Sequence, residues 1–117
     1  MGNVSDKYIK KITHKQLKEN YDQYVLISIY TDIEDVIHGT IFVTEEDYYI
    51  DKALKENKKI VFYGYDENDI KHYQSMYEVY GSYIGYEHIY FYENGLKEWL
   101  FFNSIYGNHE YPIYRYV

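Results

Sequence analysis

The sequence predicts a single α+β domain in which two or three short helices pack on a mainly antiparallel sheet of about five or six strands. Three observations support this prediction. The chain has 117 residues, of which 46% are hydrophobic, so one packed core is expected. Short runs rich in β-branched and aromatic residues alternate quickly with capped helical segments. No linker rich in Pro, Gly or Ser divides the chain. We therefore treat residues 1–117 as one domain.

The first predicted helix begins at Thr13 and runs to about Tyr21. Thr13 and Gln16 match a capping box, and Ile12 and Leu17 are spaced to form a hydrophobic staple across the first turn. Runs of β-branched and aromatic residues predict the strands in this part of the chain. They are 24–30, 36–43 with a bulge at Gly39, and 59–63.

Two further helices are predicted to begin at acidic segments. The first follows Thr44, because carboxylates in a first turn interact favourably with the helix dipole, and it ends near Asn57. The second is capped by the segment 66–69. Its apolar and aromatic residues recur at helical spacing and should share one face. They are Ile70, Tyr73, Tyr77 and Tyr80.

The last third of the chain is predicted to consist of strands. Asn94-Gly95 favours a two-residue type I′ turn, which would join strands 86–92 and 96–102 in a hairpin. The segment 111–117 is expected to be an edge strand, because its proline lacks the amide needed inside a sheet. The alternative to the hairpin is a helix after Gly95, built on the helical spacing of Leu96, Trp99, Leu100 and Asn103.

The net charge of −7 is distributed unevenly along the chain. Residues 21–51 contain eight acids and no Lys or Arg, and residues 60–93 contain six acids and one Lys. Binding to a phosphate backbone requires clustered cations, so direct binding to duplex nucleic acid is disfavoured. A basic surface on another protein is the partner that this charge favours. The alternative is that these acids form ordinary solvated faces.

The composition also bears on location. The chain has no cysteine, which excludes disulfides, thiolate nucleophiles and thiolate zinc sites and fits a reducing compartment. No apolar run approaches the roughly 18–20 residues needed to cross a bilayer. The first residues lack the apolar stretch of a secretory signal. We expect a cytoplasmic protein.

No catalytic, cofactor-binding or metal-binding residue is predicted. The five histidines are scattered and form no His-x-x-x-His pair. The serines form no Gly-x-Ser-x-Gly elbow, and no glycine-rich phosphate-binding loop is present. Carboxylate pairs are so numerous that no single pair indicates acid–base catalysis. We expect a protein that is not an enzyme and that has no cofactor.

One short segment resembles a known signature. Gly107-Asn108-His109-Glu110 resembles the Gly-Asn-His-Glu motif of metallophosphoesterases, which implies a two-metal site. The resemblance covers four residues. Asp35 and His38 depart from the Asp-x-His-Gly spacing of that family by one residue, and the motif supplying the bridging carboxylate is missing. The sequence therefore does not predict this activity.

Tyrosine is the outlying residue type, with 19 of the 117 residues. Nine of them lie between Tyr63 and Tyr92. A domain of this size is too small to bury all of these rings and satisfy every hydroxyl, so many must be partly exposed. In one interpretation Tyr replaces Phe or Leu at the edge of the core. In the other, exposed Tyr supplies contact area for a binding partner.

The leading hypothesis is a small inhibitor from a phage or mobile element that acts on a nucleic-acid-acting host defence enzyme. It resembles anti-CRISPR and other DNA-mimic proteins in size, acidity and lack of cysteine. Carboxylates would occupy a basic groove, and Tyr rings would add apolar contact. The alternatives are an immunity protein for a nuclease toxin, a nucleotide-sequestering protein with a Tyr-lined pocket, and a structural or homodimeric accessory protein. The candidate partner-binding residues are Asp32, Glu34, Asp35, Glu45, Glu46, Asp47, Tyr65, Asp66, Glu67, Asp69, Tyr73 and Tyr77.

Overall fold

The computed structural model describes residues 10–29, 35–41 and 46–115. The α-helices are α1 (His14–Glu19), α2 (Glu46–Lys55), α3 (Ile70–Ile84) and α4 (Gly95–Tyr106). Short 3₁₀ turns are η2 (Tyr21–Gln23), η4 (Glu67–Asp69) and η5 (Tyr86–His88). The strands are β1 (Tyr24–Ser28), β2 (Asp35–Ile37), β3 (Lys59–Tyr63), β4 (Ile89–Tyr92) and β5 (Ile113–Arg115).

The sheets differ from the prediction. The strands β1, β3 and β4 form a parallel sheet in the order β1-β3-β4, and β2 pairs with β5 in a separate antiparallel sheet. The expected antiparallel sheet of five or six strands was therefore wrong. So was the expected number of helices, since four α-helices occur within the described residues. The crossovers that parallel pairing requires are provided by α2, between β1 and β3, and by α3, between β3 and β4.

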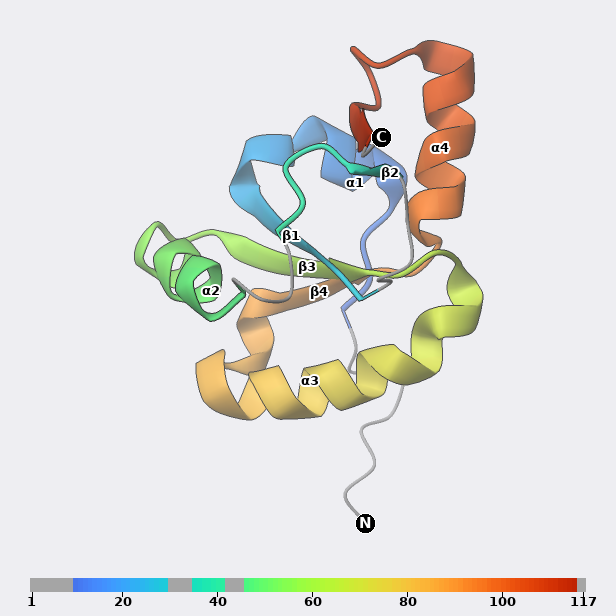
Figure 1. Cartoon of the computed structure of the whole chain (residues 1–117). Helices are drawn as coiled ribbons and strands as arrows, with labels where there is room; N and C mark the ends of the chain where they lie inside the picture. The colour runs from blue at the N-terminus through green and yellow to red at the C-terminus, as the bar shows by residue number, and fades with distance from the viewer. Residues whose placement is uncertain (1–9, 30–34, 42–45, 116–117) are drawn as a thin grey trace.

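The parallel sheet lies between two layers (Figure 1). Helices α2 and α3 cover one face, and α1, α4 and β2 cover the other. Along β3, Ile60 and Phe62 point into the first layer. Val61 and Tyr63 point into the second. Because both faces of β3 are covered, its sequence is a continuous apolar run rather than an alternating one.

The predicted hairpin around Asn94-Gly95 was wrong, and the alternative helix after Gly95 is confirmed as α4. A type I′ turn needs positive φ at both central residues. Asn94 has a φ of −72°, and Gly95 alone of the pair has a positive value, 70°. Leu96 and Trp99 are buried three residues apart, as one face of a helix requires.

The edge of β4 that a hairpin would have used is occupied by another part of the chain. The Phe91 N–H donates to the Lys10 carbonyl at 2.8 Å, and the Ile12 N–H donates to the Phe91 carbonyl at 3.0 Å. The start of the expected strand 86–92 also differs, because residues 86–88 form η5. Residues 10–12 therefore close this edge of the sheet.

The expected strand 36–43 is shorter in the structure. It ends at Ile37, where His38 and Gly39 turn the chain, and Gly39 adopts a φ of 90° within this turn rather than in a bulge. The Thr40 hydroxyl donates to the Ile37 carbonyl at 2.6 Å and closes the turn. Residues 42 and 43 lie outside the described residues.

The tail contributes the predicted edge strand. Residues 113–115 form β5, which follows Pro112 and pairs antiparallel with β2. The carbonyl of Pro112 accepts two hydrogen bonds at 3.0 Å, from the His38 N–H and from Trp99 Nε1–H. These contacts connect β2, β5 and α4 within one layer. Residues 116 and 117 lie outside the described residues.

Local signals for helix ends were predicted correctly. The Thr13 hydroxyl accepts the Gln16 N–H at 3.1 Å, and the Gln16 side chain accepts the Thr13 N–H at 2.9 Å, so the capping box is confirmed. Ile12 and Leu17 are both buried. Asn57 has a φ of 58°, the left-handed conformation that ends many helices. The predicted start at Thr44 lies outside the described residues.

One buried hydroxyl connects the parallel sheet to the layer above it. Tyr63 Oη accepts the Ile37 N–H at 3.2 Å and lies 2.6 Å from the Thr40 hydroxyl. Because Thr40 donates its own proton to the Ile37 carbonyl, Tyr63 must donate to Thr40 Oγ1. The Tyr21 hydroxyl is also buried, but it has no hydrogen-bond partner among the described residues.

These two hydroxyls give a matched pair of substitutions. Tyr63→Phe leaves the Ile37 N–H buried without an acceptor and should lower the free energy of unfolding by about 1–3 kcal/mol. Tyr21→Phe removes a buried group without a partner and should change stability by less than about 0.5 kcal/mol or increase it. Urea denaturation at pH 7 measures both. Equal losses for the two variants would contradict the proposed roles of these hydroxyls.

Candidate functional site

Acidic segments follow the carboxyl ends of the parallel strands. Asp66, Glu67 and Asp69 come soon after β3, and Glu93 follows β4 directly. Parallel strands end at the same edge of a sheet, and open α/β folds commonly bind ligands beyond the carboxyl ends of their strands. We call residues 64–69 together with 93–98 the carboxyl edge.

The loop 64–69 is held by its own carboxylates. Asp69 Oδ2 accepts the N–H of Tyr65 at 2.8 Å and that of Asp66 at 3.4 Å. Asp66 Oδ1 accepts the N–H of Asn68 at 3.0 Å. The segment 66–69 was expected to cap α3. Asp69 occupies the N-cap position, but its side chain makes no cap bond to that helix. Two of the three predicted acids in this loop therefore bond to loop amides.

The start of α4 docks on the same loop. The N–H of Leu96 donates to the Gly64 carbonyl at 2.9 Å, and the N–H of Lys97 donates to the Tyr65 carbonyl at 2.8 Å. A Cβ on Gly95 would lie only 2.5 Å from the Gly64 oxygen, so no larger residue fits there. These amides at the N-terminus of α4 are therefore already bonded and do not bind an anion.

The side chains of the carboxyl edge differ in exposure. Glu67 is exposed, and 37% of Tyr65 is accessible to solvent. Glu93 pairs with Lys11 at 3.0 Å. Glu98 accepts hydrogen bonds from the Tyr92 hydroxyl and the Asn94 amide, at 2.8 and 2.9 Å. Tyr65 and Glu67 are thus the predicted residues that are exposed at this edge.

Two of the other predicted residues have structural roles. Asp35 forms an ion pair with Arg115 at 2.8 Å between β2 and β5. Tyr77 is 5% exposed and packs with Tyr86 and Phe91, at ring centroid distances of 4.8 and 6.1 Å. The ring of Tyr77 is therefore core and supplies no contact surface. The other predicted partner-binding residues, or their side chains, lie outside the described part of the chain. They are Asp32, Glu34, Glu45, Glu46, Asp47 and Tyr73.

The described tyrosines divide between core and surface. The rings of Tyr63, Tyr77, Tyr92 and Tyr111 are buried. Five others are exposed, each on a different element or loop, so exposed Tyr is spread over the molecule rather than gathered beside the acids. They are Tyr48, Tyr65, Tyr86, Tyr106 and Tyr114.

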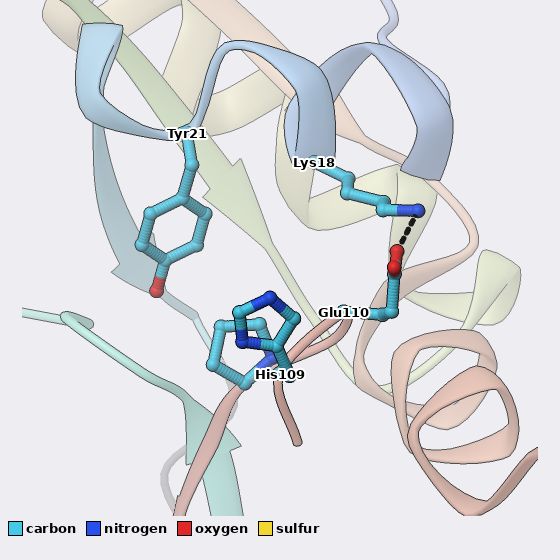
Figure 2. A pocket seen from close by; sticks show the side chains of 5 residues that line it. Lys18, Tyr21, His109 and Glu110 are labelled. Atoms are coloured by element: carbon cyan, nitrogen blue, oxygen red, sulfur yellow. Dashed lines mark ion pairs between the residues drawn. The ribbon is translucent and has the colours of Figure 1, made fainter. Parts of the chain in front are cut away.

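A pocket of about 330 Å³, which the sequence did not predict, lies between α1 and the turn after α4 (Figure 2). Lys18 and Glu110 form an ion pair at one side, and His109 and Tyr21 lie on the other. The ion pair raises the pKa of Lys18 and lowers the pKa of Glu110. A second pocket of about 210 Å³ lies beside α2. Each pocket is lined by one Tyr, so neither is the Tyr-lined nucleotide pocket considered above.

The Gly107–Glu110 segment forms the turn beside this pocket. Gly107 ends α4 with a φ of 91°, and Asn108 Oδ1 accepts the N–H of Ile113 at 2.9 Å. In the described part of the chain, no group of three or more His, Asp or Glu side chains is arranged to hold a metal ion. The resemblance to the metallophosphoesterase motif is thus carried by a helix-ending turn.

Comparison with known proteins does not identify the chain. No family model matches it, and no curated protein matches it significantly. In the ranges that the structure describes, no helix is both long enough and apolar enough to cross a membrane.

The docking of α4 on the loop can be tested with two glycines. Gly95→Ala should destabilise the protein through a positive φ and through collision with the Gly64 and Tyr65 backbone. Gly107→Ala has a comparable positive φ but open space around its Cβ, so it costs backbone strain alone. We expect Gly95→Ala to lower the unfolding midpoint more, by the equivalent of about 1–3 kcal/mol. Equal midpoints would show that this close approach is unimportant.

Alkaline pH should destabilise the protein. Burial raises the pKa of Tyr21, and less strongly those of Tyr24, Tyr77 and Tyr111. A folded pKa above the unfolded value gives stability that is complete below about pH 10 and is lost as pH rises above it. Urea denaturation from about pH 8 to 12 should show this loss, with a shallower slope in Tyr21→Phe. A slope unchanged by that substitution would contradict the assignment.

Proposed function

We propose that this protein is a small acidic binding protein, not an enzyme, whose carboxyl edge engages a basic surface on a partner protein. The observation that carries the proposal is the exposure of Tyr65 and Glu67 on a loop whose amides and carbonyls are bonded to Asp69 and to α4. A surface fixed before binding loses less conformational entropy when the complex forms.

The partner class follows from charge. With a net charge of −7 the protein repels nucleic acid but is attracted to the basic grooves that bind it. A nucleic-acid-acting enzyme, such as a host defence nuclease, has a groove of this kind. We propose that the protein inhibits such an enzyme by occupying its groove, in the cytoplasm of a bacterial cell and in the manner of a DNA mimic encoded by a phage or mobile element.

The two exposed side chains, Glu67 and Tyr65, would contribute to binding in different ways. Glu67 replaces a phosphate as the anion that meets Lys or Arg in the groove, which speeds association and makes it sensitive to salt. The Tyr65 ring supplies apolar contact area at a small cost in side-chain entropy, and its hydroxyl adds hydrogen-bonding capacity. Glu67 should therefore affect mainly the association rate, and Tyr65 mainly the dissociation rate.

The test combines capture with competition. Affinity capture from a host lysate at about 50 mM salt should recover a nucleic-acid-binding enzyme, and the purified protein should displace labelled nucleic acid from that enzyme. Glu67→Lys should weaken displacement about tenfold or more, and so should Tyr65→Ala. The protein itself should not shift labelled duplex DNA in the same buffer.

Matched controls exclude general effects of charge and of aromatic loss. Glu56→Lys makes the same change of charge at the end of α2, next to the opposite edge of the sheet, and should leave displacement unchanged. Tyr48→Ala removes an exposed ring from α2 and should also have no effect. The proposal fails if Glu56→Lys weakens displacement as much as Glu67→Lys. It also fails if the protein displaces labelled nucleic acid from no captured enzyme.

A further inference from the structure

The exposed side of α4 is unusually apolar for so charged a protein. Residues 99–108 contain no charged side chain, although 26% of the whole chain is charged. Within this run, Phe101, Ile105 and Tyr106 are 59%, 53% and 58% exposed. They are three of the eight large exposed hydrophobic residues in the described part of the chain, and all three lie on the last two turns of one helix.

The Ser104 hydroxyl on this helix is internally satisfied. Ser104 Oγ donates to the Phe101 carbonyl at 2.6 Å, so it does not need water or a partner as an acceptor. Phe101 also packs edge-on against Phe102, with ring centroids 5.5 Å apart, and Phe102 stacks on Tyr106 at 6.0 Å. Helix periodicity places Phe101, Ser104 and Ile105 on one side of α4, and Phe102 connects Tyr106 to them. We define Phe101, Ser104, Ile105 and Tyr106 as the outer face of α4, which is largely apolar.

Lys97 near the start of α4 and the negative dipole at the C-terminal end of α4 are complementary when two copies of the helix pair in antiparallel orientation. Lys97 lies in the first turn, where a cation is unfavourable to the dipole of its own helix, and the last turn carries no basic residue. Residue 97 lies four positions before residue 101, and residue 105 lies four after it. In an antiparallel pair centred on Phe101, each Lys97 therefore reaches the carbonyl end of the other helix.

We propose that the outer face of α4 is a homodimer interface, in which two copies pair about a two-fold axis that passes near Phe101. The three exposed apolar side chains offer roughly 100 Å² each, or about 600 Å² in the pair. Stable dimers bury at least about 1,200 Å². The dimer should therefore be weak, with a dissociation constant on the order of 100 μM. Apart from Lys97, the contact lies outside the carboxyl edge, and it does not depend on the proposed function.

Salt distinguishes this association from the binding of a basic partner. Each copy carries −7, so two copies repel each other, and screening this repulsion with salt should strengthen dimerisation. Binding of the acidic carboxyl edge to a basic groove should weaken under the same change. The two proposals can therefore fail independently.

Sedimentation equilibrium of the full chain, from about 10 μM to 1 mM, tests the dimer. Wild type should dimerise more tightly at about 0.5 M than at 0.05 M salt. Phe101→Glu should weaken association at least tenfold, because the two new carboxylates face each other across the axis. Val79→Glu places the same charge on an equally exposed apolar position of α3 and should have no comparable effect. Circular dichroism confirms that both variants fold.

A mixing experiment tests the symmetry. Phe101→Lys alone should also fail to dimerise, but a mixture of Phe101→Lys with Phe101→Glu should associate, because residue 101 of one copy then faces the opposite charge on the other. A wild type that remains monomeric up to about 1 mM would overturn the proposal. So would dimerisation that survives Phe101→Glu, or a mixture that associates no better than either variant alone.

Discussion

The central constraint in this structure is the burial of β3 on both faces. Because β1 and β4 pair with it in parallel, each connection must cross back over the sheet. Helices α2 and α3 do so and cover one face of β3, while α1, α4 and β2 cover the other. The Tyr63 hydroxyl then meets the turn after β2 and positions the small antiparallel sheet above it. The same strand is followed by Gly64 and Tyr65, whose carbonyls accept hydrogen bonds from the start of α4.

Signals that act within a few residues were sufficient to predict several elements. Thr13 and Gln16 satisfy each other across one turn, and Asn57 needs only its own backbone to adopt a positive φ. The predictions that failed depend on distant contacts. Asn94-Gly95 favours a hairpin in isolation, but the Gly64 and Tyr65 carbonyls, about thirty residues earlier, bind the amides that follow and begin a helix. Parallel pairing likewise depends on crossovers that no short segment encodes.

In the candidate site too, local features could be predicted from the sequence, and contacts between distant residues could not. Tyr65 and Glu67 were predicted as surface residues and are exposed, because a loop between a buried strand and a helix has little protein around it. Tyr77 was assigned to the surface by composition, but Phe91 in β4 packs against its ring. Asp35 is neutralised by Arg115, eighty residues later. Neither partner is recognisable without the fold.

The pairing of β2 with β5 has a consequence for how the chain folds during synthesis. The parallel sheet and the helices α2 and α3 are complete once residue 92 has left the ribosome. The layer on the other face stays incomplete until residues 113–115 emerge and pair with Asp35–Ile37. Until then, the layer that covers Val61 and Tyr63 lacks β5, so the nascent protein passes through a stage in which a chaperone or an inappropriate contact competes with this strand for β2.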